Sequence, residues 1–282
     1  MDSFCNRKIE VDLHIHTICS DGTDTPEKVV ELAKERGLSL ISITDHDTVS
    51  GIKSAEIVAK KLGIDFIPGI EVTADTFSFP KGAEFHILGY SIDVESVALK
   101  QLVDFFSGTR KERNRLLIKK LEKEGFNISY DDVSSCFGEN FGKPNIVTVL
   151  VEKKLVSDRK EAFTILKRCE VKRKKLDYRE IFLLIKEAGG VPVVAHPVTL
   201  GISRSSYFEF FKKLKSNGLE GIEVVHSLHT PSHVRYFREI ASELSLFTTG
   251  GSDYHGYNKP DISLGMLKIK LKDLNFSMFA GV

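Results

Sequence analysis

Side chains able to bind metal ions recur along this chain of 282 residues, mostly where short apolar runs end. The candidate ligands are His14, His16, Asp21, His46, Glu71, His86, His196, Asp253 and His255. Imidazole and carboxylate groups without cysteine favour Zn, Mn or Fe over Ca. Because the set exceeds what one ion needs, we expect two or three divalent metal ions that share a bridging carboxylate. Clusters of this kind activate water and hydrolyse phosphate esters.

The placement of these residues carries the prediction, because a single histidine at the end of a strand is usually structural. Residues i and i+2 of a strand point to the same side, so His14 and His16 can bind one ion together. The carboxyl ends of parallel strands meet on one face, where barrel enzymes build their sites. Seven of the nine histidines fall at such positions, beside acidic residues whose burial a shared metal cluster would offset.

The elements that must position these ligands follow an α/β pattern, in which short β-branched runs alternate with helical patterns. The expected strands are 9–14, 40–44, 65–73, 84–90, 191–195, 221–225 and 246–250. Helix signals lie between them: Thr25 is a cap, Pro26 suits a first position, and Gly37 and Gly63 end helices. Seven strands with covering helices predict a closed or nearly closed barrel.

The alternation stops over residues 95–178, which become helical and basic. Leu116, Leu117 and Leu121 are expected on one buried face, Pro144 at a helix start, and Ser157 at a further helix cap. We therefore expect a barrel with the metal site over residues 1–94 and 179–282, interrupted by an inserted helical subdomain over 95–178.

Charge divides the chain in the same way. Residues 107–175 hold eighteen Lys and Arg against ten Asp and Glu, a net charge of +8, so the remainder carries −7 within the total of +1. A basic block suits phosphates and an acidic body suits cations. The apolar runs are shorter than a membrane span, and no signal-peptide pattern opens the sequence. We expect a cytoplasmic location, without a membrane partner or an obligate protein partner.

Several motifs together resemble one superfamily in order and spacing. DLHIHTICSDGTDTPEKVV, ITDHDTVSGI, PGIEVT, HILGY, AHP, GIEV and TGGSDYHG are similar to the PHP (polymerase and histidinol phosphatase) superfamily of metal-dependent phosphoesterases. RNRLLIKKLEKEG and GKPNIVTVL resemble its branch of nucleoside 3′,5′-bisphosphate phosphatases and 5′–3′ exoribonucleases. The resemblance implies an α/β fold, a distorted (β/α)7 TIM-like barrel, whose inserted α-helical subdomain acts as a substrate lid.

The resemblance also implies how the ligands are shared among ions. A first site would use His14, His16, Glu71 and Asp253, and a second would use Glu71 as a bridge with His86 and His196. A third site would use Asp21, His46 and His255. Many relatives have histidine where Asp21 stands, so the third site is expected to be weaker or to prefer a harder ion.

Substrate contacts are implied for three further residues. His229 matches a histidine that would donate a hydrogen bond to phosphate or protonate the leaving oxygen, beside Asp253 as the other catalytic residue. Arg113 and Lys143 would hold a neighbouring phosphate. Lys143 stands in GKPN where relatives read GRPH. His226 and His233 match no ligand position and are expected at the surface or in packing.

The expected activity is therefore hydrolysis of phosphate monoesters or diesters of nucleotides. Nucleoside 3′,5′-bisphosphates and short 5′-phosphorylated RNA are the expected substrates, attacked by a hydroxide that bridges two ions. One alternative is histidinol phosphatase, although a small cationic substrate gains little from a basic insert. The other is a non-catalytic module that binds metal or nucleic acid, although such modules typically lose ligands.

Overall fold

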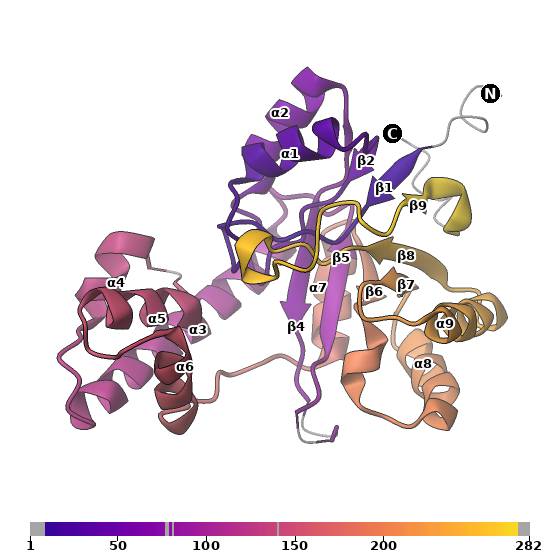
Figure 1. Cartoon of the computed structure of the whole chain (residues 1–282). Coiled ribbons are helices and arrows are strands. Elements are labelled where there is room, and N and C mark those ends of the chain that lie inside the picture. The colour runs from indigo at the N-terminus through magenta and orange to yellow at the C-terminus, as the bar shows by residue number, and fades with distance from the viewer. Residues whose placement is uncertain (1–8, 77–78, 81, 140, 276–282) are drawn as a thin grey trace. The chain divides into compact units, whose positions relative to one another are not determined.

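The chain folds into two units of mixed α/β and helical structure (Figure 1). The computed structural model describes residues 9–76, 79–80, 82–139 and 141–275; the first eight residues, where a signal peptide was sought, lie outside them. One unit comprises residues 1–102 and 176–282, and the other comprises residues 103–175. The predicted α/β class is confirmed, and both sheets belong to the first unit.

The first sheet has the strand order β3-β2-β1-β9. Its strands are β1 (Glu10–Asp12), β2 (Leu40–Ile41), β3 (Asp65–Phe66) and β9 (Ile269–Lys270), and its helices are α1 (Pro26–Glu35) and α2 (Ile52–Leu62). The Thr25 hydroxyl accepts the Lys28 N–H and caps α1, as expected, and Gly63 ends α2 with a φ of 65°. The antiparallel strand β9 was not expected from the sequence.

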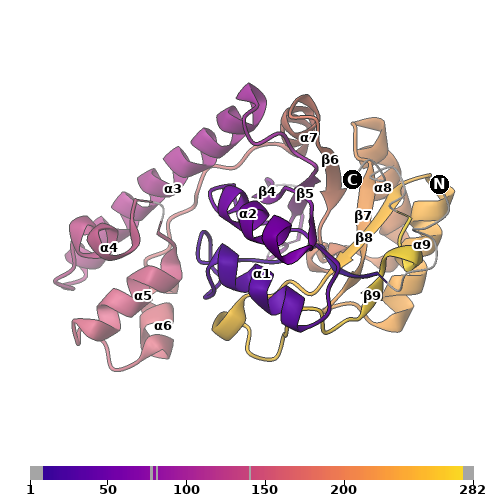
Figure 2. The same ribbon diagram turned by 90° about the horizontal axis from the view of Figure 1, so that it is seen from above.

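The second sheet has the order β4-β5-β6-β7-β8. Its strands are β4 (Gly69–Thr73), β5 (His86–Tyr90), β6 (Val191–Val194), β7 (Gly221–His226) and β8 (Phe247–Gly251), accompanied by α7 (Tyr178–Glu187), α8 (Tyr207–Ser216) and α9 (Pro231–Glu243) (Figure 2). The expectation of uniformly parallel strands is wrong at β5, which runs antiparallel to both neighbours. A parallel connection needs a crossover, and the described residues between β4 and β5 form no helix.

The run 65–73, expected as one strand, is two strands in different sheets. Pro68 has no N–H to continue a ladder, so β3 ends before it and β4 begins after it. Gly69 then passes close to the first sheet, because a Cβ there would lie 2.5 Å from Ser42 Oγ and 2.8 Å from Thr44 Cγ2.

Backbone hydrogen bonds connect the two sheets beyond their named strands. On one side, Leu13 N–H donates to the Gly250 carbonyl (3.1 Å), and Asp253 N–H donates to the His14 carbonyl (2.9 Å). On the other side, Glu71 N–H donates to the Asp45 carbonyl (3.2 Å). A Cβ at Gly251 would overlap the backbone nitrogen and Cβ of His14, so glycine permits this close approach.

The second unit is helical. It contains most of α3 (Val97–Lys123) together with α4 (Tyr130–Phe137), α5 (Lys143–Glu152) and α6 (Arg159–Arg168). Leu117 and Leu121 are buried in its core, as expected, but Leu116 is 46% exposed because it is one residue, about 100° of helix rotation, away from Leu117.

Two expected helix starts lie close to those in the second unit. Pro144 occupies the first turn of α5, and the cap of α6 is Asp158, one residue after the expected Ser157. Ser157 instead donates its hydroxyl to Glu161 (2.6 Å). In the described part of the chain, no helix is both long and apolar enough to cross a bilayer.

Candidate metal centre

The second sheet brings His86 and His196 to one edge because β5 is reversed. His86 opens β5 and pairs in register with Thr73 at the end of β4. His196 directly follows β6, and the Ala195 N–H donates to the His86 carbonyl (3.1 Å). The first residue of an antiparallel strand thus reaches the same edge as the last residues of its neighbours.

The first predicted group is assembled from both ends of the sequence. His14 Nε2 and His16 Nε2 lie 3.1 Å apart, and they lie 3.3 and 3.1 Å from Glu71 Oε2. Asp253 Oδ1 lies 3.6 Å from His14 Nε2 and 3.3 Å from His16 Nε2. Ligands about 2.1 Å from a tetrahedral ion are separated by roughly 3.4 Å, so these donor atoms fit one divalent ion.

The second predicted group shares the same glutamate. His86 Nδ1 lies 3.1 Å from Glu71 Oε1, and His196 Nε2 lies 3.0 Å from the same oxygen. The two imidazole nitrogens are 3.3 Å apart. Glu71 therefore presents Oε2 to the first group and Oε1 to the second, the geometry of a carboxylate that bridges two ions.

The third predicted group is looser. His255 Nε2 lies 3.3 Å from Asp21 Oδ1, whereas His46 Nε2 lies 3.9 Å from Asp21 Oδ2. His46 Nδ1 also lies 3.1 Å from Glu71 Oε2, so this ring faces both Glu71 and Asp21. These three residues and His16 form a cluster able to hold an ion.

Burial and charge set the protonation states that metal binding requires. Burial alone would raise the pKa of the Glu71 carboxyl, but His46, His14 and His86 hold it well below its ordinary value. Burial lowers the pKa of His46 to about 3 and lowers that of His196. An ionised carboxylate and neutral imidazoles are the forms that ligate metals.

His16 differs from these rings. Burial opposes its protonation, yet its hydrogen bonds to Asp253 and Glu71 raise its pKa to about 10. A proton on His16 occupies the place between carboxylates that a cation would take, so metal binding there releases a proton.

Glu223, for which the sequence predicts no role, contacts two of the predicted ligands. It is fully buried in β7; its Oε1 lies 2.9 Å from His14 Nδ1, and its Oε2 accepts the His196 N–H (2.7 Å). An acceptor at Nδ1 leaves the lone pair of His14 on Nε2, which faces the first group. A glutamate within the apolar run of GIEV was the available signal.

Two further residues contact the Asp253 oxygen that faces away from the first group. Lys259 Nζ lies 2.5 Å from Asp253 Oδ2, and His226 Nε2 lies 3.4 Å from it. His226 Nδ1 accepts the Leu228 N–H (3.1 Å), so Nε2 carries the proton. His226 is 1% exposed, so the expected position at the surface is wrong. The ring is packed in the interior, the other expected position, and there it also contacts the candidate ligand Asp253. His233 belongs to the capping box of α9.

The structure places the predicted substrate residues as follows. His229 Nδ1 donates to the Val224 carbonyl (2.7 Å), so Nε2 of the neutral ring is an acceptor, and burial lowers the pKa of His229 to about 4. In the second unit, Lys143 pairs with Glu170 (3.1 Å). Arg113 Nε is buried without a hydrogen-bond partner among the described residues, and burial and neighbouring arginines lower its pKa to about 10.

This arrangement defines a class of protein, an α/β protein with a clustered histidine and carboxylate centre suited to several divalent ions. The PHP domain family matches residues 12–188, and the chain belongs to that family. The recognition made from the motifs is thereby confirmed.

Three relatives are similar over most of their length. A phosphoribosyl 1,2-cyclic phosphate 1,2-diphosphodiesterase from Eggerthella lenta is 30% identical over 87% of this chain and 94% of that protein. A 5′–3′ exoribonuclease from Haemophilus influenzae is 29% identical over 86% and 89%, and a 3′,5′-nucleoside bisphosphate phosphatase from Chromobacterium violaceum is 30% identical over 87% of each chain. All three names describe hydrolases of phosphoric ester bonds, which confirms the expected enzyme class.

Solved structures agree with the fold. A protein from Bifidobacterium adolescentis described as a metal-dependent phosphoesterase aligns with a TM-score of 0.79 and 29% identity, covering 95% of this chain and 94% of that one. An amidohydrolase from Chromobacterium violaceum aligns with a TM-score of 0.75 and 26% identity, covering 94% and 95%.

Proposed function

We propose that this enzyme hydrolyses phosphate esters of nucleotides, with nucleoside 3′,5′-bisphosphates and short 5′-phosphorylated RNA as substrates. The observation that carries the proposal is the pair of donor groups on the two oxygens of Glu71, with separations of 3.0–3.6 Å. Of the relatives that match over most of their length, one is named as a 5′–3′ exoribonuclease and another as a 3′,5′-nucleoside bisphosphate phosphatase. The match to the exoribonuclease covers 86% of the chain, more than the first unit alone contains.

We assign His14, His16, Glu71 and Asp253 to a first ion, Glu71, His86 and His196 to a second, and Asp21, His46 and His255 to a third, with Mn, Zn or Fe as the metals. Bound there, the ions would supply an activated water and neutralise charge on the phosphoryl oxygens. Glu223 keeps His14 in the ligating tautomer, and Lys259 and His226 orient Asp253.

The substrate would also be contacted by residues outside the metal ligands. His229 contacts the substrate; its neutral Nε2 accepts a hydrogen bond, and it can protonate a leaving oxygen only after gaining a proton. Arg113 supplies a guanidinium with an unused buried donor for a neighbouring phosphate, and Lys143 adds positive charge after exchanging Glu170 for the substrate. The helical insert, residues 95–178, serves as the substrate lid.

We also propose that the two sheets form one distorted (β/α)7 TIM-like barrel. Support comes from the parallel bridges between Ile15 and Tyr254 and between His46 and Glu71, which lie on the two sides where the sheets meet. The expected cytoplasmic location remains part of the proposal.

A second substrate class needs testing, because the Eggerthella lenta relative is named for a cyclic phosphate diester. Release of phosphate and hydrolysis of esters would be measured with added Mn on nucleoside 3′,5′-bisphosphate, short 5′-phosphorylated RNA, phosphoribosyl 1,2-cyclic phosphate and histidinol phosphate. We expect the highest kcat/KM on one of the first two. Preference for either of the last two would overturn the assigned substrate.

The Asp253→Asn variant tests the site itself. Asn tolerates the left-handed backbone of residue 253 (φ 61°) but removes a charged ligand, so turnover should fall at least about a hundredfold with the fold retained. Asp261→Asn, in an exposed loop, is the matched control. Full activity of Asp253→Asn would contradict the assigned metal site. Absence of bound transition metal in protein purified without chelator would instead favour the non-catalytic module.

A further inference from the structure

His196, the candidate ligand that directly follows β6, has a backbone conformation that few residues adopt. Its φ is 23° and its ψ is 61°, and the left-handed region costs a residue with a Cβ about 1–2 kcal/mol. Such conformations persist only where several contacts fix them. Here the His196 N–H donates to Glu223 Oε2 (2.7 Å), and the Thr199 N–H donates to the His196 carbonyl (3.0 Å). These contacts fix the backbone of His196, whereas the orientation of its ring needs a contact of its own.

A side-chain hydroxyl supplies the contact to the ring. Thr199 Oγ1 lies 2.9 Å from His196 Nδ1, and the hydroxyl also donates to the Glu84 carbonyl (3.0 Å) or to the His196 carbonyl (3.1 Å). A carbonyl oxygen only accepts, so a hydroxyl that donates to it keeps its lone pairs for the Nδ1 proton. The lone pair of the imidazole is then on Nε2, which lies 3.0 Å from Glu71 Oε1 in the second group.

His14 has a comparable partner, but a charged one. Glu223 Oε1 lies 2.9 Å from His14 Nδ1, and His14 Nε2 faces the first group. A hydrogen bond to a carboxylate is roughly twice as strong as one to a neutral hydroxyl, so it increases the basicity of a ligating imidazole more. His14 should therefore be the stronger of these two imidazole ligands. The first group also has four donor residues, whereas the second has three.

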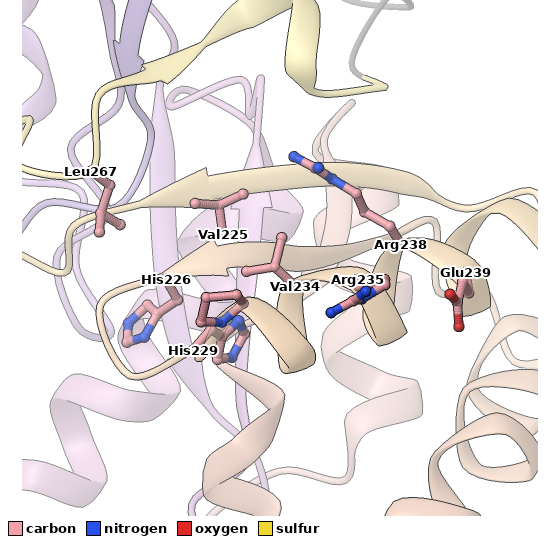
Figure 3. A pocket seen from close by; sticks show the side chains of 9 residues that line it. Val225, His226, His229, Val234, Arg235, Arg238, Glu239 and Leu267 are labelled. Atoms are coloured by element: carbon pink, nitrogen blue, oxygen red, sulfur yellow. The ribbon is translucent and has the colours of Figure 1, made fainter.

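The histidines at the end of β7 are held by the backbone instead. Figure 3 shows the rings of His226 and His229 beside this strand end. His226 Nδ1 accepts the Leu228 N–H (3.1 Å), and His229 Nδ1 donates to the Val224 carbonyl (2.7 Å). A side-chain substitution cannot remove such a partner, whereas Thr199→Val removes a hydroxyl with little change of volume. The contribution of Thr199 can therefore be measured directly.

We propose that Thr199 is a positioning residue whose hydroxyl sets how tightly the second ion is held, and that this ion exchanges more readily than the first. The hydroxyl keeps the His196 ring with Nε2 toward Glu71 Oε1, and because this partner is neutral, it strengthens the ligand less than Glu223 strengthens His14. The inference rests on the proposed function, because it assumes the assignment of ligands to two ions, and it deepens that assignment by ranking the two sites.

The test is a calorimetric titration of Zn²⁺ into protein freed of metal by a chelator. The step that His86→Ala removes identifies the second ion, because His86 is assigned to that ion alone. In the wild type this step should not be the tightest. We expect Thr199→Val to raise the Kd of this step at least about tenfold, the lower end of the usual cost of losing a partner of a metal-bound histidine. Thr199→Ser keeps the hydroxyl and should bind Zn²⁺ as the wild type does.

The variant should keep its fold, because the Glu84 N–H still donates to the Thr199 carbonyl (3.0 Å). Thr164→Val is the matched control: it removes a hydroxyl that donates to the Lys160 carbonyl (2.9 Å) on the exposed face of α6, and it should bind Zn²⁺ as the wild type does. A merely structural role of Thr199 would lower the melting temperature of the metal-free protein and weaken every Zn²⁺ step equally. That result would overturn the proposal, as would an unchanged second step in Thr199→Val.

A comparison with activity separates this inference from the proposed function. If Thr199→Val weakens only the second step, but the metal-loaded wild type hydrolyses none of the phosphate esters tested, the role of Thr199 stands and the proposed activity fails. If the loaded wild type hydrolyses a nucleotide substrate while the second step is indifferent to Thr199, the activity stands and the inference fails. A loss of affinity in Thr199→Ser as large as that in Thr199→Val would also overturn the inference, because the serine hydroxyl can accept the same proton.

Discussion

At the scale of single residues, the metal centre depends on carboxylates whose two oxygens face different groups. Glu71 is 1% exposed and connects the first and second groups. Glu223 repeats the arrangement one layer further out, with one oxygen toward His14 and the other toward the His196 backbone. The positions of both groups are therefore coupled through buried glutamates.

We predict that Glu223→Gln weakens metal binding about 10- to 100-fold, the usual cost of losing a partner of a metal-bound histidine. A glutamine amide can still accept from His14 Nδ1, but its NH2 group then faces the His196 N–H, another donor. Metal retained after dialysis would be measured by mass spectrometry. Glu220→Gln, which removes only the surface pair with Lys186, is the control; unchanged retention in Glu223→Gln would contradict the assigned role.

The metal ligands could be predicted from their residue types, whereas the residues that contact these ligands could not. His14, Glu71 and Asp253 stand out because metal-binding groups recur at strand ends. His226 also ends a strand, but its meaning depends on the position of Asp253, which only the fold supplies. Lys259 has no signal in its local sequence, because it reaches Asp253 through the turn at Gly256–Asn258.

At the scale of elements, β-branched runs predicted where the strands lie. They did not predict the direction of each strand or the sheet to which it belongs. Alternation shows where a strand lies but not which neighbour it pairs with. The reversal of β5 fits a connection whose described residues form no crossover helix, and the split at Pro68 follows from one missing N–H. Both features were visible in the sequence as a short connection and a proline.

We predict that Gly251→Ala abolishes metal binding, because the new Cβ would overlap the backbone of His14 and displace it. Bound metal and the melting temperature should both fall. Gly108→Ala is the matched control, since a Cβ there meets open space within α3 and should stabilise that helix by about 0.5–1 kcal/mol. Wild-type metal content in Gly251→Ala would show that the strand end tolerates the methyl group.

The start of α4 gives a prediction about pH. The hydrogen bond from Lys153, followed by that from the Ser129 backbone, lowers the pKa of Asp132 from 3.8 to about 2. The resulting stability is present above about pH 3.8 and is lost as pH falls through 2. Asp132→Asn should lower the free energy of unfolding, measured by urea titration at neutral pH, by under about 1 kcal/mol, as for surface pairs, with a difference that shrinks between pH 4 and 2. Asp131→Asn is the control, and a difference independent of pH would contradict the ionic contribution.

At the scale of the whole molecule, the candidate ligands and the basic block lie in different units. All the ligands belong to residues 1–102 and 176–282, whereas the +8 block of residues 107–175 falls entirely in the other unit. Composition gave this division of charge, but the core of the second unit, with Leu117 and Ile146, required the structure.

We predict that a chelator destabilises one unit and spares the other. Ions that bind only the folded first unit add about 2.7 kcal/mol at a concentration of one hundred times Kd. Hydrogen exchange should therefore accelerate on chelation in β1 and β7 but not around Leu117 in α3. Equal acceleration in both units would contradict the separation, and exchange without added chelator provides the reference.

The long separation of His14 and Asp253 in sequence has a consequence for the order of events during synthesis. A ribosome makes His14, His16 and Glu71 long before Asp253 and His255, so the nascent chain carries part of the centre without its remaining ligands. The complete donor set exists only after residue 255 has emerged. Metal acquisition in the final geometry is then a late step of maturation, and ions bound earlier must be held by fewer ligands and exchange more readily.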